Sequence, residues 1–543
     1  MIAVYSAILA LLLAIVLVPV LAHWAGTLGL LDKPGPRKIH HESVPRVGGI
    51  AIAVGALVAV AVWIPLRSVV AGYFVGAVII FVSGLMDDRF NLDYRLKFVG
   101  QIAGALAFVF LGDFELTRVP FASHSVMPAW LGIPLTVVVL VGITNAINLS
   151  DGMDGLAGGM SLLAAGTLGY LAYIGGDKAA AILALCLVGA ILGFLRYNTH
   201  PARVFMGDSG SQFLGFSVAA LGLILIERSD TSVSPLVPVL VLGLPITDTV
   251  QVMIRRVLAG GSPFVPDRRH LHHRLLDVGL SQQGAVLLVY LLQGALVWIA
   301  WSLRYEHDAV VFAVFVLFVA SLMTGMAIWE KSFAAGRIQS RRWTLVEPLV
   351  AYLRRSSLLS RLGFWGVLYG VSVLFVVVAV LAADVSADIG WLALLLFGIL
   401  LSTHLPQKLL SPLALERVAT FTTSVLTIYL AESSGLGRIG DLAWFHGYLV
   451  LILLCIGLWL RFGGTRGFQL NALDLLIVLV VAIVPNMPVV RESGLAPMVL
   501  ESLLLFYACE LILNESNDRR RVFRLSTLLA LAILTVRAVA IAA

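Results

Sequence analysis

The chain has 543 residues, of which 60% are hydrophobic and 13% are charged, and its net charge is +6. Soluble globular domains are about half apolar and about a quarter charged, so this composition excludes an ordinary soluble protein. Apolar runs long enough to cross a bilayer as helices recur along the whole chain. The composition therefore predicts an all-α polytopic membrane protein, whose positive charge indicates loop orientation and not a nucleic-acid partner.

The apolar runs predict about eleven transmembrane helices in the first part of the chain and about seven in the last part. The helices predicted in the first part are 1–22, 48–66, 69–86, 97–112, 130–147, 159–175, 179–195, 211–226, 234–254, 284–303 and 309–329. The helices predicted in the last part are 363–382, 389–404, 411–430, 444–461, 474–490, 495–513 and 522–541. The first helix lacks the basic start of a secretory signal, so we expect it to be retained.

A basic segment separates the two groups of helices. Residues 331–361 are rich in Lys and Arg and contain a single acid, Glu347. Such segments lie against anionic headgroups at the cytoplasmic face of a membrane. We therefore divide the chain into a membrane domain (1–330), a basic cytoplasmic linker (331–361) and a C-terminal transmembrane region of unknown role (362–543).

The distribution of Lys and Arg predicts which loops face the cytoplasm. One set of alternate loops is strongly basic and includes Arg37, Arg89, Arg196, Arg255 and Arg274. The other set is less basic and holds Arg67, Arg118, Lys178, Arg228 and Arg304. Because basic loops remain in the cytoplasm, the first set is predicted to be cytoplasmic and the N-terminus to be outside.

Five polar clusters interrupt the helices of the first domain, and all of them fall in the loops assigned to the cytoplasm. They are LDKPGPRKIHHESVPRVGG (31–49), GLMDDRFNLDYRLKFVGQ (84–101), NAINLSDGMDGLAGG (145–159), RYNTHPARVFMGDSGS (196–211) and SPFVPDRRHLHHRLLDVGLS (262–281). Outer loops such as GDFELTRVP hold no comparable cluster. This asymmetry predicts one site at the cytoplasmic surface.

The clusters contain the residue types that bind a divalent cation and phosphate. Their acids are Asp87, Asp88, Asp151, Asp154 and Asp208. Hard oxygen ligands of this kind suit Mg²⁺ or Mn²⁺, which bind carboxylates together with substrate phosphates. The bases that can hold anionic oxygens are Lys97, Arg268, His270, His272 and His273. Acids for a metal beside bases for phosphate, at a membrane surface, indicate phosphoryl transfer.

Each motif also has an ordinary explanation. Acids at helix ends are often solvated, the histidine motif could belong to a basic cytoplasmic loop, and Lys97 could extend to the headgroups. A different class of protein, an ion-coupled transporter, would place its acids in broken helices near the bilayer midplane. Here the acids lie at helix ends on one face, which favours a catalytic site.

Residues 1–330 resemble the polyprenyl-phosphate N-acetylhexosamine-1-phosphate transferases of glycosyltransferase family 4. The matching stretches are DKPGPRKIH, PRVGG, GLMDDRF, NAINLSDGMDGLAGG, NTHPARVFMGDSG and SPFVPDRRHLHHR. The histidine motif, interrupted by Leu271, is similar to that of the undecaprenyl-phosphate N-acetylglucosamine-1-phosphate transferase branch. The resemblance implies a Mg²⁺-dependent enzyme that transfers a sugar 1-phosphate from a UDP-sugar to undecaprenyl phosphate and releases UMP.

The resemblance also implies roles for individual residues. The implied metal ligands are Asp208 and Asn148. The implied catalytic acids are Asp87, Asp88, Asp151 and Asp154. The first two of these lie near the incoming lipid phosphate, and one of them is the implied base. The implied substrate-binding residues are Lys97, Asn198, Phe205, Arg268, His270, His272 and His273, with the Phe205 ring stacking on uracil.

The identity of the sugar stays open at this stage. The branch favours N-acetylglucosamine, but a fucosamine or galactosamine type of UDP-N-acetyl sugar would fit the same motifs. The expected partners are this UDP-sugar, undecaprenyl phosphate and membrane lipid, and a homodimer is left open. The resemblance places the enzyme in the bacterial inner (plasma) membrane, with a cytoplasmic active site that initiates a surface polysaccharide such as O-antigen. In the C-terminal region, Glu416, His446 and Asp474 are isolated in sequence and are expected to be ordinary loop or helix-end charges.

Overall fold

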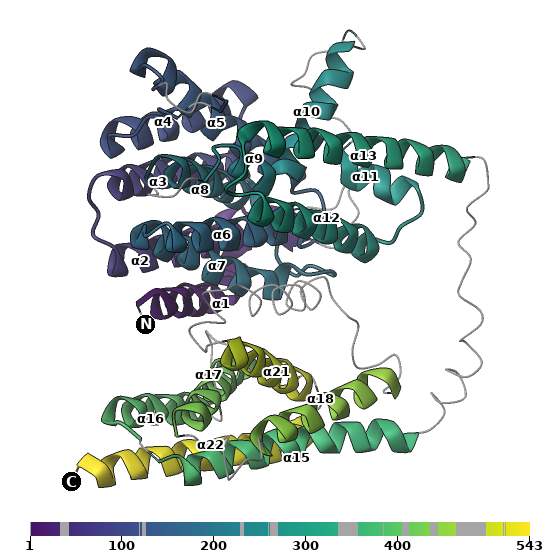
Figure 1. The fold of residues 1–543 in the computed structure, drawn as a ribbon. Helices are drawn as coiled ribbons and strands as arrows, with labels where there is room; N and C mark the ends of the chain where they lie inside the picture. The colour runs from purple at the N-terminus through teal and green to yellow at the C-terminus, as the bar shows by residue number, and fades with distance from the viewer. Residues whose placement is uncertain are drawn as a thin grey trace. The chain divides into compact units, whose positions relative to one another are not determined.

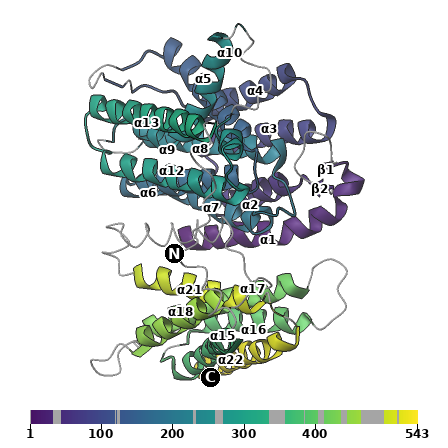
Figure 2. The same cartoon turned by 90° about the vertical axis from the view of Figure 1, so that its right-hand side faces the viewer.

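The computed structural model of the chain is almost entirely α-helical (Figure 1). It describes residues 2–32, 43–118, 120–121, 126–228, 233–258, 260, 270–334, 357–383, 385–403, 412–434, 444–462, 496–513, 515 and 517–542. Two short strands, β1 (Leu31–Asp32) and β2 (Val44–Pro45), form an antiparallel pair that follows the first helix (Figure 2). The prediction of an all-α architecture is confirmed.

The described residues fall into two compact units, one before residue 341 and the other essentially after it. The helices of the first unit are α1 (Ile2–Leu28), α2 (Gly48–Trp63), α3 (Val69–Phe90), α4 (Tyr94–Gly112), α5 (Ala129–Ser150), α6 (Leu156–Ile174), α7 (Lys178–Asn198), α8 (Gly207–Arg228), α9 (Val237–Val241), α10 (Gly243–Leu258), α11 (Leu271–Asp277), α12 (Gln282–Ser302) and α13 (Asp308–Ala334). The helices of the second unit are α15 (Ser357–Leu381), α16 (Ala387–Ser402), α17 (Pro412–Ser433), α18 (Trp444–Phe462), α21 (Ala496–Leu513) and α22 (Asn517–Ala542).

The helices have the length and composition of membrane spans. Within the described ranges, eleven helices are long and apolar enough to cross a bilayer, and four shorter apolar helices accompany them. Most predicted spans match an observed helix within a few residues. The predicted helix 474–490 and most of the predicted linker lie outside the described residues. The chain is therefore a multi-pass membrane protein, as its composition predicted.

Helix α8 lies at the centre of the first unit. It is buried along its whole apolar stretch and packs against α2, α3, α5 and α6. Glycines permit this close packing near its N-terminus. A Cβ at Gly49 would lie 2.2 Å from the backbone nitrogen of Gly210, and one at Gly84 would lie 2.6 Å from the Cα of Ser209. The small residues thereby place the start of α8 between α2 and α3.

One predicted span, 234–254, is interrupted in the structure. It divides into α9 and α10 at Leu242, so the prediction of one continuous helix was wrong. Pro245 explains the break, since it has no N–H to donate to the carbonyl of Val241 four residues earlier. The Nε2 of Gln293 on α12 donates to that carbonyl instead, at 2.5 Å. A neighbouring helix thus satisfies the freed backbone group, as a membrane interior requires.

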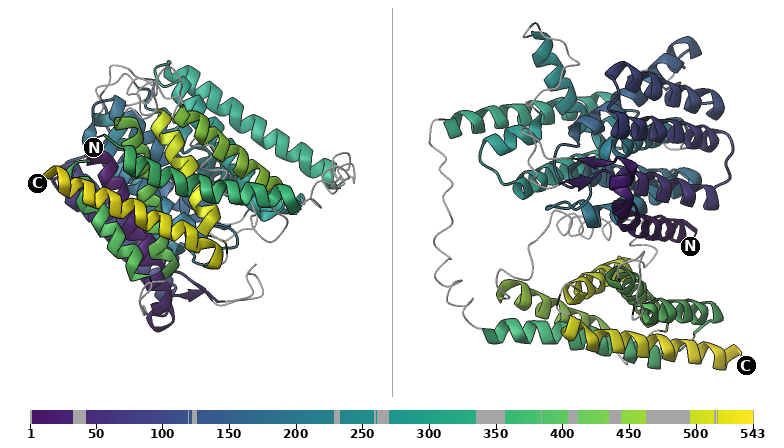
Figure 3. Two further views of the ribbon diagram at one scale, coloured as in Figure 1. Left: turned by 90° about the horizontal axis from the view of Figure 1, so that it is seen from below. Right: turned by 180° about the vertical axis from the view of Figure 1, so that it is seen from behind.

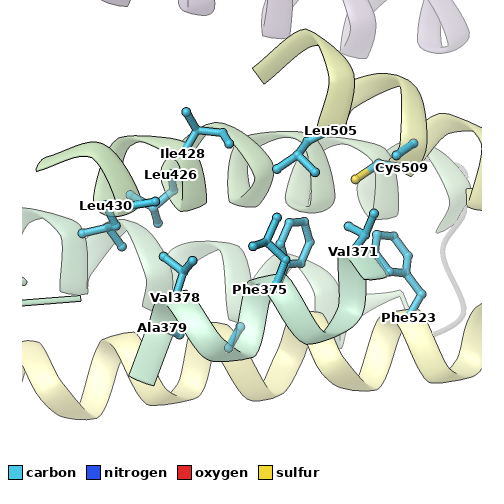
Figure 4. Close-up of a cluster of buried hydrophobic side chains, with 14 of the residues drawn as sticks. Val371, Phe375, Val378, Ala379, Leu426, Ile428, Leu430, Leu505, Cys509 and Phe523 are labelled. Atoms are coloured by element: carbon cyan, nitrogen blue, oxygen red, sulfur yellow. The ribbon is translucent and has the colours of Figure 1, made fainter. Parts of the chain in front are cut away.

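The second unit has a hydrophobic core of its own. Side chains from all six of its described helices contribute to it, and Figure 4 shows Val371, Phe375, Leu426, Leu505 and Phe523 among them. Helices α15 and α22 run side by side in this unit (Figure 3). Helix α17, which contains Glu416 and Arg417, is present despite these charges in its first turns.

Candidate active site

A cavity of about 710 Å³ brings together most of the residues singled out in the sequence. Its walls come from the strand pair, the end of α3, the α5–α6 and α7–α8 connections, the start of α8, and α11. The predicted site residues that line it are Asp88, Asn148, Asp151, Asp154, Asn198, Phe205, Asp208 and His273. Five polar clusters far apart in sequence therefore contribute to one space.

Asp208, in the first turn of α8, lies at the centre of a polar network beside this cavity. Its Oδ1 accepts a hydrogen bond from Nδ2 of Asn148 at 2.6 Å, and Asn148 also donates to Ser211 at 2.8 Å. The Nζ of Lys97 lies 3.5 Å from the other Asp208 oxygen and 2.5 Å from Oδ2 of Asp87. Lys97 thus joins two carboxylates that come from α3 and α8.

The two adjacent acids of α3 have different surroundings. Both oxygens of Asp88 accept backbone hydrogen bonds at the start of α8, from Asp208 N–H at 2.8 Å and Ser209 N–H at 2.9 Å. Asp88 therefore satisfies two of the N–H groups that a helix start leaves unpaired. Asp87 accepts from the Leu92 N–H at 2.9 Å through Oδ1 and faces Lys97 through Oδ2. Of these two acids, Asp88 lines the cavity and positions Asp208, whereas Asp87 is buried beside Lys97 and is not among the residues that line the cavity.

Asp151 lies directly after α5, where it lines the cavity. Burial, followed by the charges of Asp208, Asp88 and Asp154, raises the pKa of Asp151 to about 7. Arg46 of the strand pair acts in the opposite direction. Arg46 also lines the cavity, where it forms an ion pair with Asp32. The cavity therefore holds more carboxylates than cations, and a bound cation would offset this excess negative charge.

Asp154 and Asn198 fix the loop that connects α7 to α8. Oδ2 of Asp154 accepts from Nδ1 of His200 at 2.8 Å and from the Ala202 N–H at 3.1 Å. The buried amide of Asn198 accepts from the Gly155 N–H and donates to the Val204 carbonyl, each at 2.9 Å. Both side chains therefore shape the cavity wall that leads to Phe205. Their direct roles toward the nucleotide, and the stacking of Phe205 on uracil, stay predictions.

The histidine motif divides into one half-buried and two buried members. His273 lines the cavity, and its ring centroid lies 4.3 Å from that of His272. His272 is buried against the α5–α6 loop, where a Cβ at Gly152 would lie 2.2 Å from its Nε2. His270 is also buried, behind His272. Of the described motif residues, only His273 reaches the cavity, and Arg268 lies outside the described residues.

Asp248 is a site residue that the sequence analysis missed. Its Oδ2 lies 2.9 Å from Nδ1 of His270, and its Oδ1 accepts from the Leu271 N–H at 2.6 Å. This buried carboxylate on α10 therefore anchors the start of α11 and orients the histidine motif. An acid within an otherwise apolar predicted span was the indication available in the sequence. Arg46 and His200 were also missed, although both lie in the polar clusters.

The donor set around Asp208 fits a small divalent cation. Asp208 and Asn148 both face the cavity, and the carboxylates of Asp88 and Asp151 line the same space. Mg²⁺ binds through one or two carboxylates together with substrate phosphates. Asp208, with Asn148 beside it, could hold such an ion and still leave room for a nucleotide diphosphate.

The structure is that of a multi-pass helical membrane protein with an acid-lined cavity. Comparison with known proteins identifies its family. Residues 70–226 match the model of glycosyl transferase family 4. A Bacillus subtilis protein described as a probable undecaprenyl-phosphate N-acetylglucosaminyl 1-phosphate transferase is 40% identical over 291 residues, which cover 53% of this chain and 81% of that protein. The chain belongs to glycosyl transferase family 4, and the resemblance seen in its motifs is confirmed.

Other relatives extend the match. A decaprenyl-phosphate N-acetylglucosaminephosphotransferase of Mycolicibacterium smegmatis is 35% identical over 50% of this chain and 75% of that protein. An undecaprenyl-phosphate alpha-N-acetylglucosaminyl 1-phosphate transferase of Escherichia coli O157:H7 is 30% identical over 58% of this chain and 89% of that protein. Each match therefore leaves more than a third of this chain without a counterpart.

Proposed function

We propose that the chain transfers N-acetylglucosamine 1-phosphate from UDP-N-acetylglucosamine to undecaprenyl phosphate and releases UMP. The observation that supports this proposal most strongly is the network of Asp87, Lys97, Asn148 and Asp208, of which Asn148 and Asp208 line the acid-rich cavity. Relatives of the chain are described as transferases of N-acetylglucosamine 1-phosphate to undecaprenyl or decaprenyl phosphate. The product would be the first lipid-linked sugar of a surface polysaccharide.

In this reaction, an oxygen of the lipid phosphate attacks the β-phosphorus of the UDP-sugar. A new P–O bond forms, and the bond between the β-phosphorus and the oxygen bridging to the α-phosphate breaks, so that UMP leaves. Lys97 would attract the lipid phosphate, and Asp87 would take its proton if it arrives as the monoanion. Asp88 is the weaker candidate for the base because both of its oxygens accept backbone hydrogen bonds.

Asp208 and Asn148 are the proposed ligands of Mg²⁺ or Mn²⁺. When bound, such an ion supplies positive charge to the diphosphate as negative charge develops on the departing UMP. Arg46 and His273, which both line the cavity, would contact the diphosphate and sugar phosphate. Gly152 and Asp248 would position the histidine motif through their contacts with His272 and His270.

A donor panel tests both the reaction and the sugar. Purified full-length protein would be incubated with Mg²⁺, undecaprenyl phosphate and, separately, the UDP derivatives of N-acetylglucosamine, N-acetylgalactosamine and N-acetylfucosamine. We expect a lipid-linked sugar phosphate and UMP with the glucosamine donor. Product with another donor alone would correct the sugar, and no lipid-linked product with any donor would contradict the proposal. Light scattering of the same sample would test for a homodimer.

We also propose that the site faces the cytoplasm of a bacterial inner membrane. Cysteine placed at Arg95, an exposed residue beside the α3–α4 turn, should react with thiol reagents only from the cytoplasmic side. Ser302 is the exposed last residue of α12, and a cysteine placed there should react from outside. The native cysteines are buried or half-buried, which limits their background. If an impermeant reagent labelled the Arg95 position in intact cells, the proposed orientation would be wrong.

A further inference from the structure

Three side chains with metal-binding groups meet in the C-terminal unit, and each comes from a different helix. Glu432 lies in the last turn of α17, His446 in the first turn of α18, and Glu501 near the start of α21. One ligand atom from each residue lies within 4.8 Å of the other two. The sequence separations between these residues exclude a local turn as the cause of the arrangement.

The buried member of the cluster has an unsatisfied oxygen. Glu501 is 8% exposed, and its Oε1 lies 2.7 Å from Nδ1 of His446. Its Oε2 is buried and has no hydrogen-bond partner among the described residues. Leaving a carboxylate oxygen in this state costs roughly 1–3 kcal/mol or more, so such an atom ordinarily has a partner. The nearby carboxylate of Glu432 adds negative charge to Glu501 and cannot donate to it when ionised.

We propose that Glu432, His446 and Glu501 bind a divalent transition-metal ion, with Zn²⁺ as the best match. One imidazole nitrogen and two carboxylate oxygens suit Zn²⁺, whereas Mg²⁺ and Ca²⁺ prefer oxygen ligands alone. Three protein ligands leave a fourth position for water or for a phosphate or carboxylate of a ligand. The cation would also offset the two neighbouring carboxylates, which a single histidine cannot do.

The dimensions of the cluster permit this assignment. Donors at about 2.1 Å from a tetrahedral Zn²⁺ lie roughly 3.4 Å from one another. The three ligand atoms lie within 4.8 Å of one another in the structure. Rotamer changes that move these atoms by about 1.5 Å or less would therefore bring them to the spacing that Zn²⁺ requires. The His446 side chain is 47% exposed, which leaves an approach for the ion. In the predicted orientation these three helix ends face the outer side of the membrane.

Metal analysis of the purified full-length protein tests the site. The protein would be stripped with EDTA, supplied with excess Mg²⁺ to occupy the catalytic cavity, equilibrated with ZnCl₂ and a weak competing chelator, and analysed for bound zinc. The variants are His446→Ala and Glu501→Gln. The matched controls are Asp388→Asn, an exposed acid of the same unit, and Asp208→Asn, which alters the catalytic site.

We expect wild type and both controls to bind one Zn²⁺ more per chain than His446→Ala or Glu501→Gln. Co²⁺ gives a second measurement, because a tetrahedral site with a nitrogen ligand should produce visible absorption that the two variants lose. Equal zinc content in all five proteins would overturn the proposal, as would zinc loss only in Asp208→Asn. If a variant folds poorly, the unaltered protein still decides the question, because absence of any tight Zn²⁺ in it would show that the cluster is only a His–Glu hydrogen bond.

Discussion

Two groups of buried charges, one in each unit, differ in how they are balanced. In the C-terminal unit, Glu416 forms ion pairs with Arg520 and Arg524, and Arg417 forms a two-bond pair with Glu510. Every charge in this group therefore has an opposite charge beside it. Around the cavity of the first unit, the acids outnumber the cations. A paired buried charge thus serves the fold, whereas an unbalanced group that faces a cavity is suited to bind a charged ligand.

The two groups are difficult to distinguish in the sequence. Each consists of charged residues at the ends of apolar runs, as in GLMDDRF and PLALERVAT. Glu416 and His446 do lie near the starts of α17 and α18, as expected, but each also has a specific partner on another helix, which the sequence did not reveal. Asp474 lies outside the described residues. Mutations should separate the groups by their effects on turnover and on stability.

The largest expected effect is the loss of activity in Asp208→Asn. The change keeps the shape of the side chain but removes the charge that the proposed ion requires. We expect transferase turnover to fall roughly a hundredfold or more, comparable with the loss of a key electrostatic group in other enzymes. Glu510→Gln, in the paired group, is the control and should keep wild-type turnover per molecule. Near-normal turnover of Asp208→Asn, or full wild-type activity in EDTA, would contradict the metal assignment.

The adjacent acids of α3 provide a sharper comparison within the site. Asp87→Asn should lower turnover by about a hundredfold, a loss in the range of a missing general base, and leave the Mg²⁺ requirement unchanged. Asp88→Asn should instead raise the Mg²⁺ concentration needed for half-maximal activity and lower the melting temperature. The reason is that an amide can accept only one of the two α8 hydrogen bonds well. Measuring the activity of both variants as a function of Mg²⁺ concentration tests whether the two acids have different roles. Identical Mg²⁺ dependences would refute this difference.

The paired group should show the opposite behaviour. Arg417→Ala would remove both hydrogen bonds that the guanidinium donates to the largely buried Glu510 carboxylate, and should lower the free energy of unfolding by about 3 kcal/mol. Turnover per correctly inserted molecule should not change. The double substitution Arg417→Leu with Glu510→Leu should recover most of the stability, because apolar residues can replace a buried pair at little cost. Thermal unfolding in detergent, combined with the donor assay, measures both quantities, and a loss of turnover in the double variant would disprove a purely structural role.

The sequence predicted those features that depend on local pattern, and missed those that depend on a distant partner. Apolar length predicted nearly every helix, and the five polar clusters contain most of the residues that line the cavity. It did not predict that Gln293 would satisfy the carbonyl freed by Pro245, and so allow α9 and α10 to separate. It also could not show that Asp88 caps α8, because the N–H groups concerned lie on another helix. The type of a residue determines which interactions it can make, and the packing of the helices determines which neighbour it makes them with.

The smallest expected effect concerns His272 and the pH dependence of stability. Burial, with the neighbouring His273 next in size, lowers the pKa of His272 from 6.5 to about 4. Between these two values the unfolded chain binds the proton and the folded protein does not. The free energy of unfolding should therefore fall as the pH falls from 6.5 toward 4, by about 2 kcal/mol at pH 5, since each pKa unit corresponds to about 1.4 kcal/mol.

His272→Gln should flatten this part of the pH profile, because glutamine does not titrate. The control is His307→Gln, which changes an exposed histidine of the same unit and should keep the wild-type slope between pH 7 and pH 5. Melting temperatures of the three proteins, measured in one detergent across that range, provide the comparison. Parallel profiles for all three would mean that His272 is not held neutral against Gly152. In that case buried His272 and half-buried His273 would not differ in protonation as their surroundings suggest.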